Sequence, residues 1–236
     1  MKKVLFLFAI MSMFVSSCSK DKDDEGMDNN TLKVEQTEFH LYVGESATIV
    51  SNAINPIFSI ENKYYAAVSE DGVISAKFVG ETEITISAEN GQENIRIYIE
   101  PQYTYFNEPL MEWGATEEVI IDKYGQPDYR KNNWLGYYGS TIGENYTICF
   151  YKITDIGLES CSVIFDGCSL MSYVTIELHI SERYRKVKAQ VPVGYECYDL
   201  RGGRILSGTL SYDIINEKCE IDYSSFNGYW PPPKDY

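Results

Sequence analysis

Side chains that could act as a general base or a nucleophile are few in this sequence. The chain has two histidines, His40 and His179, which lie far apart, and no G-x-S-x-G pattern supplies a nucleophile for either of them. His179 falls on the flank of an expected helix, a place where a histidine usually has a structural role. We therefore expect no catalytic histidine.

Pairs of neighbouring carboxylates, the groups that glycoside hydrolases use, occur at Glu117-Glu118 and at Glu220 and Asp222. With 35 acidic residues such pairs arise readily, and the carboxylate separation on which that chemistry depends cannot be read from sequence. We interpret the first pair as the first turn of a helix and the second as the outward face of a strand. The sequence predicts no catalytic residue and no enzyme.

The cysteines give little sign of metal binding. An odd number follows Cys18, so they cannot all pair within one chain, and none shows C-x-x-C spacing: Cys149, Cys161, Cys168, Cys197 and Cys219. We expect no metal site and no cofactor. If residues 154–156 form a hairpin loop, Cys149 lies opposite Cys161, and the sequence leaves open whether these two form a disulfide or are small buried apolar residues.

Aromatic side chains are the stronger candidates for ligand binding. Tyr and Trp are favoured at interfaces because they combine apolar area with a polar tip. Two clusters contain the residues that we single out as ligand-binding candidates: Trp134, Tyr137, Tyr138, Tyr229 and Trp230. The alternative is ordinary strand packing for the first cluster and, for the second, a polyproline tail that lies on the domain.

Composition excludes some partners and points to two folded parts. The formal charge is −15 and becomes −17 if Lys2 and Lys3 are removed, which disfavours nucleic acid. Most of the 20 tyrosines follow residue 100, a change in composition that indicates two domains in the mature chain.

The first thirty residues resemble the export signal and tether of a bacterial lipoprotein. Lys2 and Lys3 precede an uncharged apolar run at residues 4–15, which is too short to span a bilayer. Val15-Ser16-Ser17-Cys18 then resembles a lipobox. The resemblance implies that residues 1–17 are a signal peptide and that Cys18 carries the lipid that attaches the protein to the membrane. Residues 18–30 are acidic and are expected to form a disordered tether, resembling a signal for export to the outer face of the outer membrane.

Residues 31–101 alternate short apolar strands with turn residues such as Gly44, Asp71-Gly72 and Asn90-Gly91, the pattern of an all-β sandwich. The run from Ala67 to Ala76, AVSEDGVISA, is similar to the bacterial immunoglobulin-like domain, group 2. That resemblance implies a spacer that holds another domain away from the cell, with no catalytic residue.

Residues 102–236 are expected to form an α+β domain, an antiparallel sheet with two helices. Thr116 and Ser169 are the expected first caps of helices that end near residues 124 and 184. Strands are expected at residues 135–139, 146–153, 158–165, 187–191, 195–200, 205–212 and 219–223. The order indicates a duplicated α-βββ unit.

The segment from Gly114 to Pro127 is similar to a helix signature of β-lactamase-inhibitor-protein-like domains and of small outer-membrane assembly lipoprotein domains. The resemblance implies a domain that presents a sheet face to a protein partner. We thus expect a cell-surface lipoprotein of the outer membrane whose C-terminal domain binds a protein or a glycan. The alternatives are a periplasm-facing inhibitor or assembly factor and, less favoured, a hydrolase.

Overall fold

The computed structural model describes residues 31–190, 192–198 and 204–225. Strands hold 48% and helices 13% of the described residues, so the fold is mainly β, as the sequence predicts. The described residues from Leu32 onward contain two hydrophobic cores. No helix in the described ranges is long and apolar enough to cross a bilayer.

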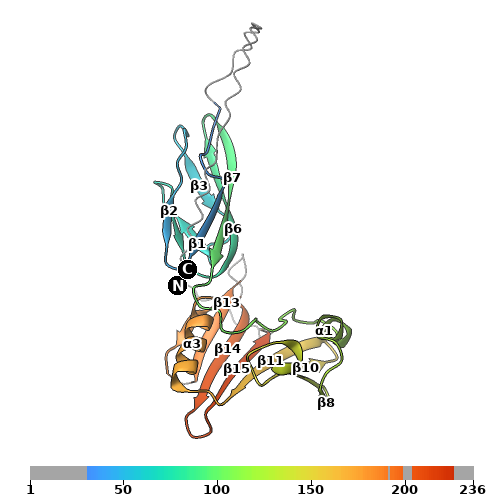
Figure 1. Cartoon of the computed structure of the whole chain (residues 1–236). Helices are drawn as coiled ribbons and strands as arrows, with labels where there is room; N and C mark the ends of the chain where they lie inside the picture. The colour runs from blue at the N-terminus through green and yellow to red at the C-terminus, as the bar shows by residue number, and fades with distance from the viewer. Residues whose placement is uncertain (1–30, 191, 199–203, 226–236) are drawn as a thin grey trace, which may run out of the picture. The chain divides into compact units, whose positions relative to one another are not determined.

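Residues 32–100, the two-sheet region, contain seven strands. Their bounds are β1 (Glu38–Tyr42), β2 (Ser46–Thr48), β3 (Ile57–Ile60), β4 (Ala66–Val68), β5 (Val73–Ala76), β6 (Gly80–Ala88) and β7 (Gly91–Glu100). One sheet has the order β1-β7-β6-β3 and the other β2-β5-β4 (Figure 1). All pairs are antiparallel except β1 with β7, which is parallel.

Alternating isoleucines of β6 and β7 build the core that both sheets share. Ile84, Ile86, Ile95 and Ile97 are fully buried, while the residues between them face outward. The Asp71-Gly72 turn forms where it was expected. Gly72 has φ +76°, and a Cβ there would lie 2.9 Å from Cζ of the Phe58 ring, so only glycine suits both the turn and the packing.

Residues 101–225, the large-sheet region, form one eight-stranded antiparallel sheet with three helices. In chain order the elements are α1 (Glu117–Tyr124), β8 (Tyr129–Lys131), β9 (Trp134–Tyr138), α2 (Gly139–Ile142), β10 (Ile148–Thr154), β11 (Gly157–Asp166), α3 (Leu170–Ser181), β12 (Arg185–Lys188), β13 (Val193–Tyr198), β14 (Arg204–Asp213) and β15 (Lys218–Ser225). The strand order is β12-β13-β14-β15-β11-β10-β9-β8 (Figure 1).

This order places two four-stranded meanders back to back, joined where β11 pairs with β15. Each meander follows a helix, α1 or α3, so the connectivity repeats. The prediction of three strands in the first unit is wrong, because β8 is a fourth strand. β8 has only three exposed residues and lacks the apolar alternation that marks a strand.

One face of the sheet packs against α3, and its alternate residues build the second core. Cys161, Val163 and Phe165 of β11 are buried, as are Ile176 and Ile180 of α3. Ser169 caps α3, as expected, by accepting a hydrogen bond from the backbone N–H of Ser172.

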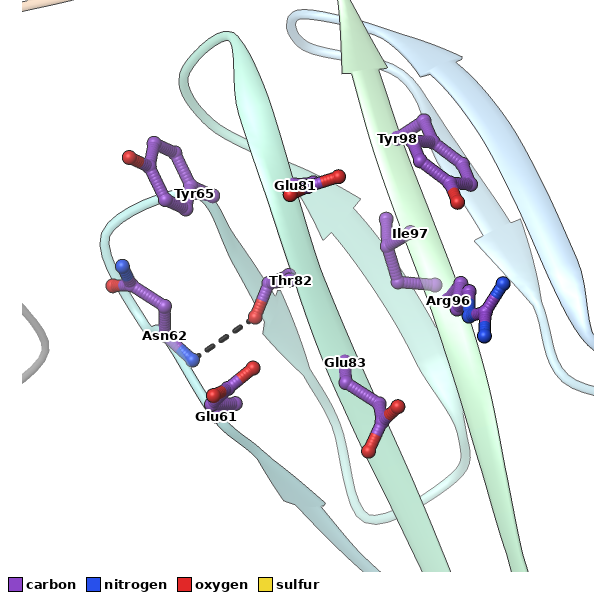
Figure 2. A pocket seen from close by; sticks show the side chains of 9 residues that line it. All are labelled: Glu61, Asn62, Tyr65, Glu81, Thr82, Glu83, Arg96, Ile97 and Tyr98. Carbon is purple, nitrogen blue, oxygen red and sulfur yellow. Dashed lines mark hydrogen bonds between the residues drawn. The ribbon is translucent and has the colours of Figure 1, made fainter.

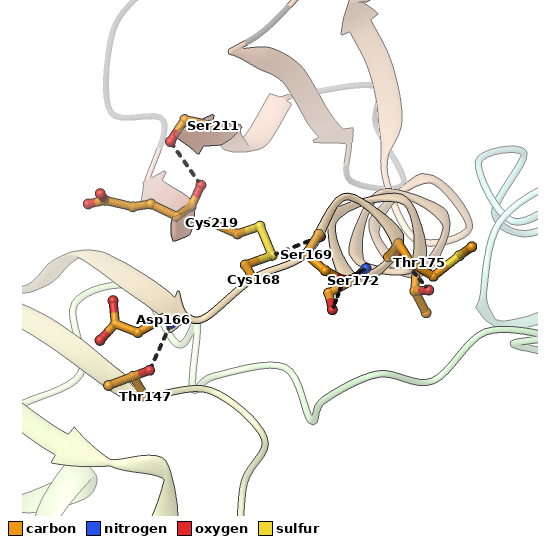
Figure 3. The surroundings of a disulfide bond; sticks show 10 residues. Thr147, Asp166, Cys168, Ser169, Ser172, Thr175, Ser211 and Cys219 are labelled. Carbon is orange, nitrogen blue, oxygen red and sulfur yellow. Dashed lines mark hydrogen bonds between the residues drawn. A yellow bond between two sulfur atoms is a disulfide. The ribbon is translucent and has the colours of Figure 1, made fainter. Parts of the chain in front are cut away.

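The sequence left open a disulfide between Cys149 and Cys161; the structure has none there, and a disulfide joins Cys168 to Cys219 (Figure 3). The β10–β11 loop is one residue shorter than assumed, since Thr154 pairs with Gly157, and a bulge follows at Lys152/Ile153. Tyr151 therefore lies opposite Cys161, and Cys149 lies opposite Val163. Cys149 and Cys161 are buried free thiols, and burial raises the pKa of Cys149 to about 12.

Candidate ligand-binding face

The second face of the eight-stranded sheet carries the most distinctive surface chemistry of the described residues. Its side chains alternate with those of the core face, so they are half-buried or exposed. Strand pairing places them in rows that cross the sheet. We call this surface the open face.

Three aromatic side chains gather at the β8 end of the open face. The ring of Phe150 meets Tyr129 edge-on, with centroids 5.8 Å apart, and Trp134 edge-on at 6.4 Å. Gly136 lies between them, and a Cβ there would lie 2.9 Å from Cε1 of Phe150. Because Gly136 has no side chain, there is room over β9 for the side chains of Tyr129 and Phe150.

These rings form one wall of an open hollow of about 440 Å³, which we call the aromatic hollow. It is lined by Tyr129, Lys131, Asn132, Trp134, Phe150, Ser162, Ile164 and Glu220. Its volume is in the range of small-ligand sites. The lining combines flat apolar rings with an ammonium, an amide, a hydroxyl and a carboxylate, so it offers both donors and acceptors of hydrogen bonds.

A polar zone continues the open face from the hollow across β11, β15 and β14. The side chains in it are small or hydroxylated apart from two carboxylates: Ser160, Ser162, Ser207, Thr209, Ser211, Glu220, Asp222 and Ser224. The hydroxyl of Ser162 donates a 2.6 Å hydrogen bond to Oδ1 of Asp222. The ammonium of Lys218 lies 3.0 Å from Glu220 and balances its charge.

The predicted ligand-binding residues are separated by the structure. Trp134 lines the hollow, and Tyr138 is exposed on the same face two rows away from Trp134. Tyr137 faces the core, fully buried, and donates a hydrogen bond to the Gly125 carbonyl at 3.1 Å, so its assignment as a ligand contact is wrong. Tyr229 and Trp230 lie outside the described residues.

Sequence reasoning missed Tyr129 and Phe150. The signal for Phe150 was present, because it alternates with the buried Cys149 and Tyr151 and so must share a face with Trp134 across the β9–β10 pair. Tyr129 could not be found in this way, since β8 was not expected.

His179 is fully buried and held on both ring nitrogens. Nδ1 accepts a hydrogen bond from the backbone N–H of Tyr105 at 3.2 Å, so Nε2 carries the proton that it donates to Glu108 at 3.1 Å. Tyr184 also donates to Glu108, at 3.2 Å. Neither nitrogen has a lone pair directed at solvent, so this arrangement positions residues 103–108 against α3 and offers no general base.

The carboxylate pairs lie where the sequence places them. Glu117 and Glu118 occupy the first turn of α1; Glu117 pairs with Arg130, and a hydrogen bond from Thr116 lowers the pKa of Glu118. Glu220 and Asp222 point outward from β15. No group of three or more histidine, cysteine or carboxylate side chains in the described ranges is arranged to hold a metal ion.

A second hollow, of about 530 Å³, lies on the two-sheet region (Figure 2). The carboxylates of Glu61, Glu81 and Glu83 surround it, with Arg96 on the neighbouring strand. The backbone N–H of Asn62 donates to the Thr82 hydroxyl at 2.9 Å, which ties the β3 end to β6. Tyr65 and Tyr98 also line this hollow, but its carboxylates give it the charges of a solvated strand face, and no ring–ring contact joins its two tyrosines as Phe150 contacts Tyr129 and Trp134 in the aromatic hollow.

No family model and no curated protein matches this sequence. Among solved structures the chain is similar to domains 4 and 5 of the S-layer protein SbsC, at 18% identity and a TM-score of 0.25, covering 29% of this chain and 50% of that one. A structure of SbsC domains 5–6 is 10% identical, with 85% of each chain covered and a TM-score of 0.25. The chain spans 27% of the structure of SbsC domains 4–9. At these TM-scores the likenesses carry no argument about function.

Proposed function

We propose that this protein is a lipid-anchored, non-enzymatic binding protein of the outer membrane, exposed on the cell surface. Cys18 is the lipidated residue, residues 18–30 are a tether, and residues 31–101 are an immunoglobulin-like spacer. Residues 102–236 are the α+β domain that contacts a protein or a glycan. The observation that carries the proposal is the aromatic hollow on the open face of the sheet.

The spacer assignment is supported by the topology of the two-sheet region. Seven short strands in two sheets around one core are the pattern of immunoglobulin-like sandwiches. Its buried isoleucines lie in that core, which suits a part whose role is to separate other parts.

A binding role in place of catalysis is supported by the chemistry of the open face. The hollow has aromatic rings and a mixture of donors and acceptors, but its lining includes no histidine and no cysteine. His179, the one buried histidine among the described residues, has both ring nitrogens occupied and belongs to the core.

Protease treatment of intact cells tests the location. We expect an added protease to remove residues 102–236 from cells that make the full chain, while a periplasmic marker stays intact. A Cys18→Ser variant should lose lipid labelling and be released from the membrane fraction. Full protection in intact cells, with cleavage only after the outer membrane is opened, would contradict surface exposure.

The second candidate is a periplasm-facing inhibitor or assembly-factor-like lipoprotein. The observation that favours it is the repeated connectivity of two helix-plus-four-strand halves that together present one continuous sheet face. The same protease experiment separates the two candidates, because the periplasm-facing protein would be cut only in opened cells.

A further inference from the structure

The register of the large sheet aligns the open face into a continuous row that starts in the aromatic hollow. Pairing places Tyr129 beside Gly136, Gly136 beside Phe150 and Phe150 beside Ser162. The same row continues through Asp222 to Thr209. One surface track thus crosses β8, β9, β10, β11, β15 and β14 at right angles to the strands.

The track has two kinds of surface in sequence. Its β8 end is aromatic, and beyond Phe150 it carries short polar side chains, those of Ser162, Asp222 and Thr209. The row on one side repeats the pattern with Ser160, Ser224 and Ser207, whereas the row on the other side carries Ile148, Ile164 and Glu220. Hydroxyl groups both donate and accept hydrogen bonds, so this surface matches a ligand that is itself rich in hydroxyls.

Charge balance points to an uncharged ligand. The protein as a whole carries a formal charge of −15, but this part of the open face has three lysines and four carboxylates: Lys131, Lys152, Lys218, Glu159, Asp166, Glu220 and Asp222. Neither sign dominates, so the track offers a polyanion or a polycation no electrostatic advantage.

We infer that the open face binds an uncharged, extended oligosaccharide that lies across the strands, with one sugar ring packed on the aromatic hollow. The C–H face of a pyranose packs on flat rings such as those of Tyr129 and Trp134, and its hydroxyls meet Ser162 and Asp222. Neighbouring strands lie about 4.8 Å apart. This spacing is close to the length of one extended hexose unit, so successive sugars meet successive strands. This inference rests on the proposed function and names the ligand class for its binding face.

Isothermal titration of the full chain with uncharged linear hexasaccharides of glucose, mannose, xylose and galactose tests the inference. We expect at least one of them to bind, and Tyr129→Ala to weaken that binding about tenfold, since 1.4 kcal/mol corresponds to a factor of ten. Tyr129 is exposed on an edge strand, so its loss should leave the fold intact. Ser162→Gln, which fills the track without removing an aromatic ring, should also weaken binding.

Tyr42→Ala is the matched control, because Tyr42 is similarly exposed, at 44% against 38% for Tyr129, and lies in β1 of the two-sheet region. It should bind as the unaltered chain does. Selection of binding peptides from a library against the same protein distinguishes the oligosaccharide inference from the proposed binding face. If no hexasaccharide binds but selected peptides do, and Tyr129→Ala abolishes their binding, the oligosaccharide is wrong and the binding face stands. If neither class binds in a manner that depends on Tyr129 or Ser162, both are wrong.

Discussion

Gly136 controls the shape of the aromatic hollow without contributing a side chain. A Cβ at this position would lie 2.9 Å from Cε1 of Phe150 and 3.1 Å from Cβ of Tyr129, so Gly136→Ala must push the two rings apart. We expect a folded variant that is about 1–3 kcal/mol less stable, the usual cost of overpacking, and that binds any ligand of the open face more weakly. Thermal unfolding and titration measure the two effects. Unchanged binding would mean that the hollow is not the contact.

His179 contributes to stability through its two hydrogen bonds. His179→Ala removes one of the two hydrogen-bond donors to Glu108 and the acceptor of the Tyr105 N–H in a buried setting, and we expect a loss of about 2–4 kcal/mol in the free energy of unfolding. His40→Ala, at an exposed histidine, is the control and should change stability little. Urea unfolding measures the free energy of unfolding of both variants. An equal loss at both positions would contradict a stabilising role for the buried hydrogen bonds of His179.

Long alternating elements were predictable, and short or register-dependent features were not. The segments that form β11, β14 and β15 have apolar residues at every second position, and each was expected within a few residues of its bounds. The disulfide and the side of the sheet that Tyr137 faces were missed for a physical reason. Strand alternation gives two faces but not which one packs against a helix, and one residue of loop length moves a cysteine to a different partner.

The edge strand β1 is held to β7 by a titratable contact as well as by the sheet. Nδ1 of His40 lies 2.8 Å from Glu100 and Nε2 lies 3.0 Å from Glu38, while the imidazole stacks on Tyr98 with centroids 4.9 Å apart. Hydrogen bonds to Glu100, and then to Glu38, raise the pKa of His40 above its ordinary value of 6.5.

A raised pKa in the folded state gives the sign of the pH effect. The protonated form is favoured by folding, so its stabilisation is fully present below pH 6.5 and is lost as the pH rises through the folded pKa. We expect the melting temperature to decline slightly over that interval, and the difference between the unaltered chain and His40→Gln to disappear at higher pH. A parallel pH dependence in both proteins would assign the effect to other groups.

At the scale of the whole molecule, the Cys168–Cys219 bond joins the segment before α3 to β15 and spans a sequence separation of 51 residues (Figure 3). Disulfides persist in oxidising compartments, so this bond agrees with the export that we propose for the chain. The bond connects the beginning of the second helix-plus-four-strand half to its last strand, because Cys168 precedes α3 and Cys219 lies in β15.

Production of residues 18–236 in the cytosol tests this link between export and stability. Denatured cytosolic protein should show two more reactive thiols than exported protein when both carry Cys18→Ser. It should also be less stable by about 4 kcal/mol, the chain-entropy value for a loop of this length. Cys168→Ser with Cys219→Ser in the exported protein should reproduce that loss, whereas Cys149→Ala should leave the thiol difference at two. Equal thiol counts in the two compartments would show that the bond does not depend on export.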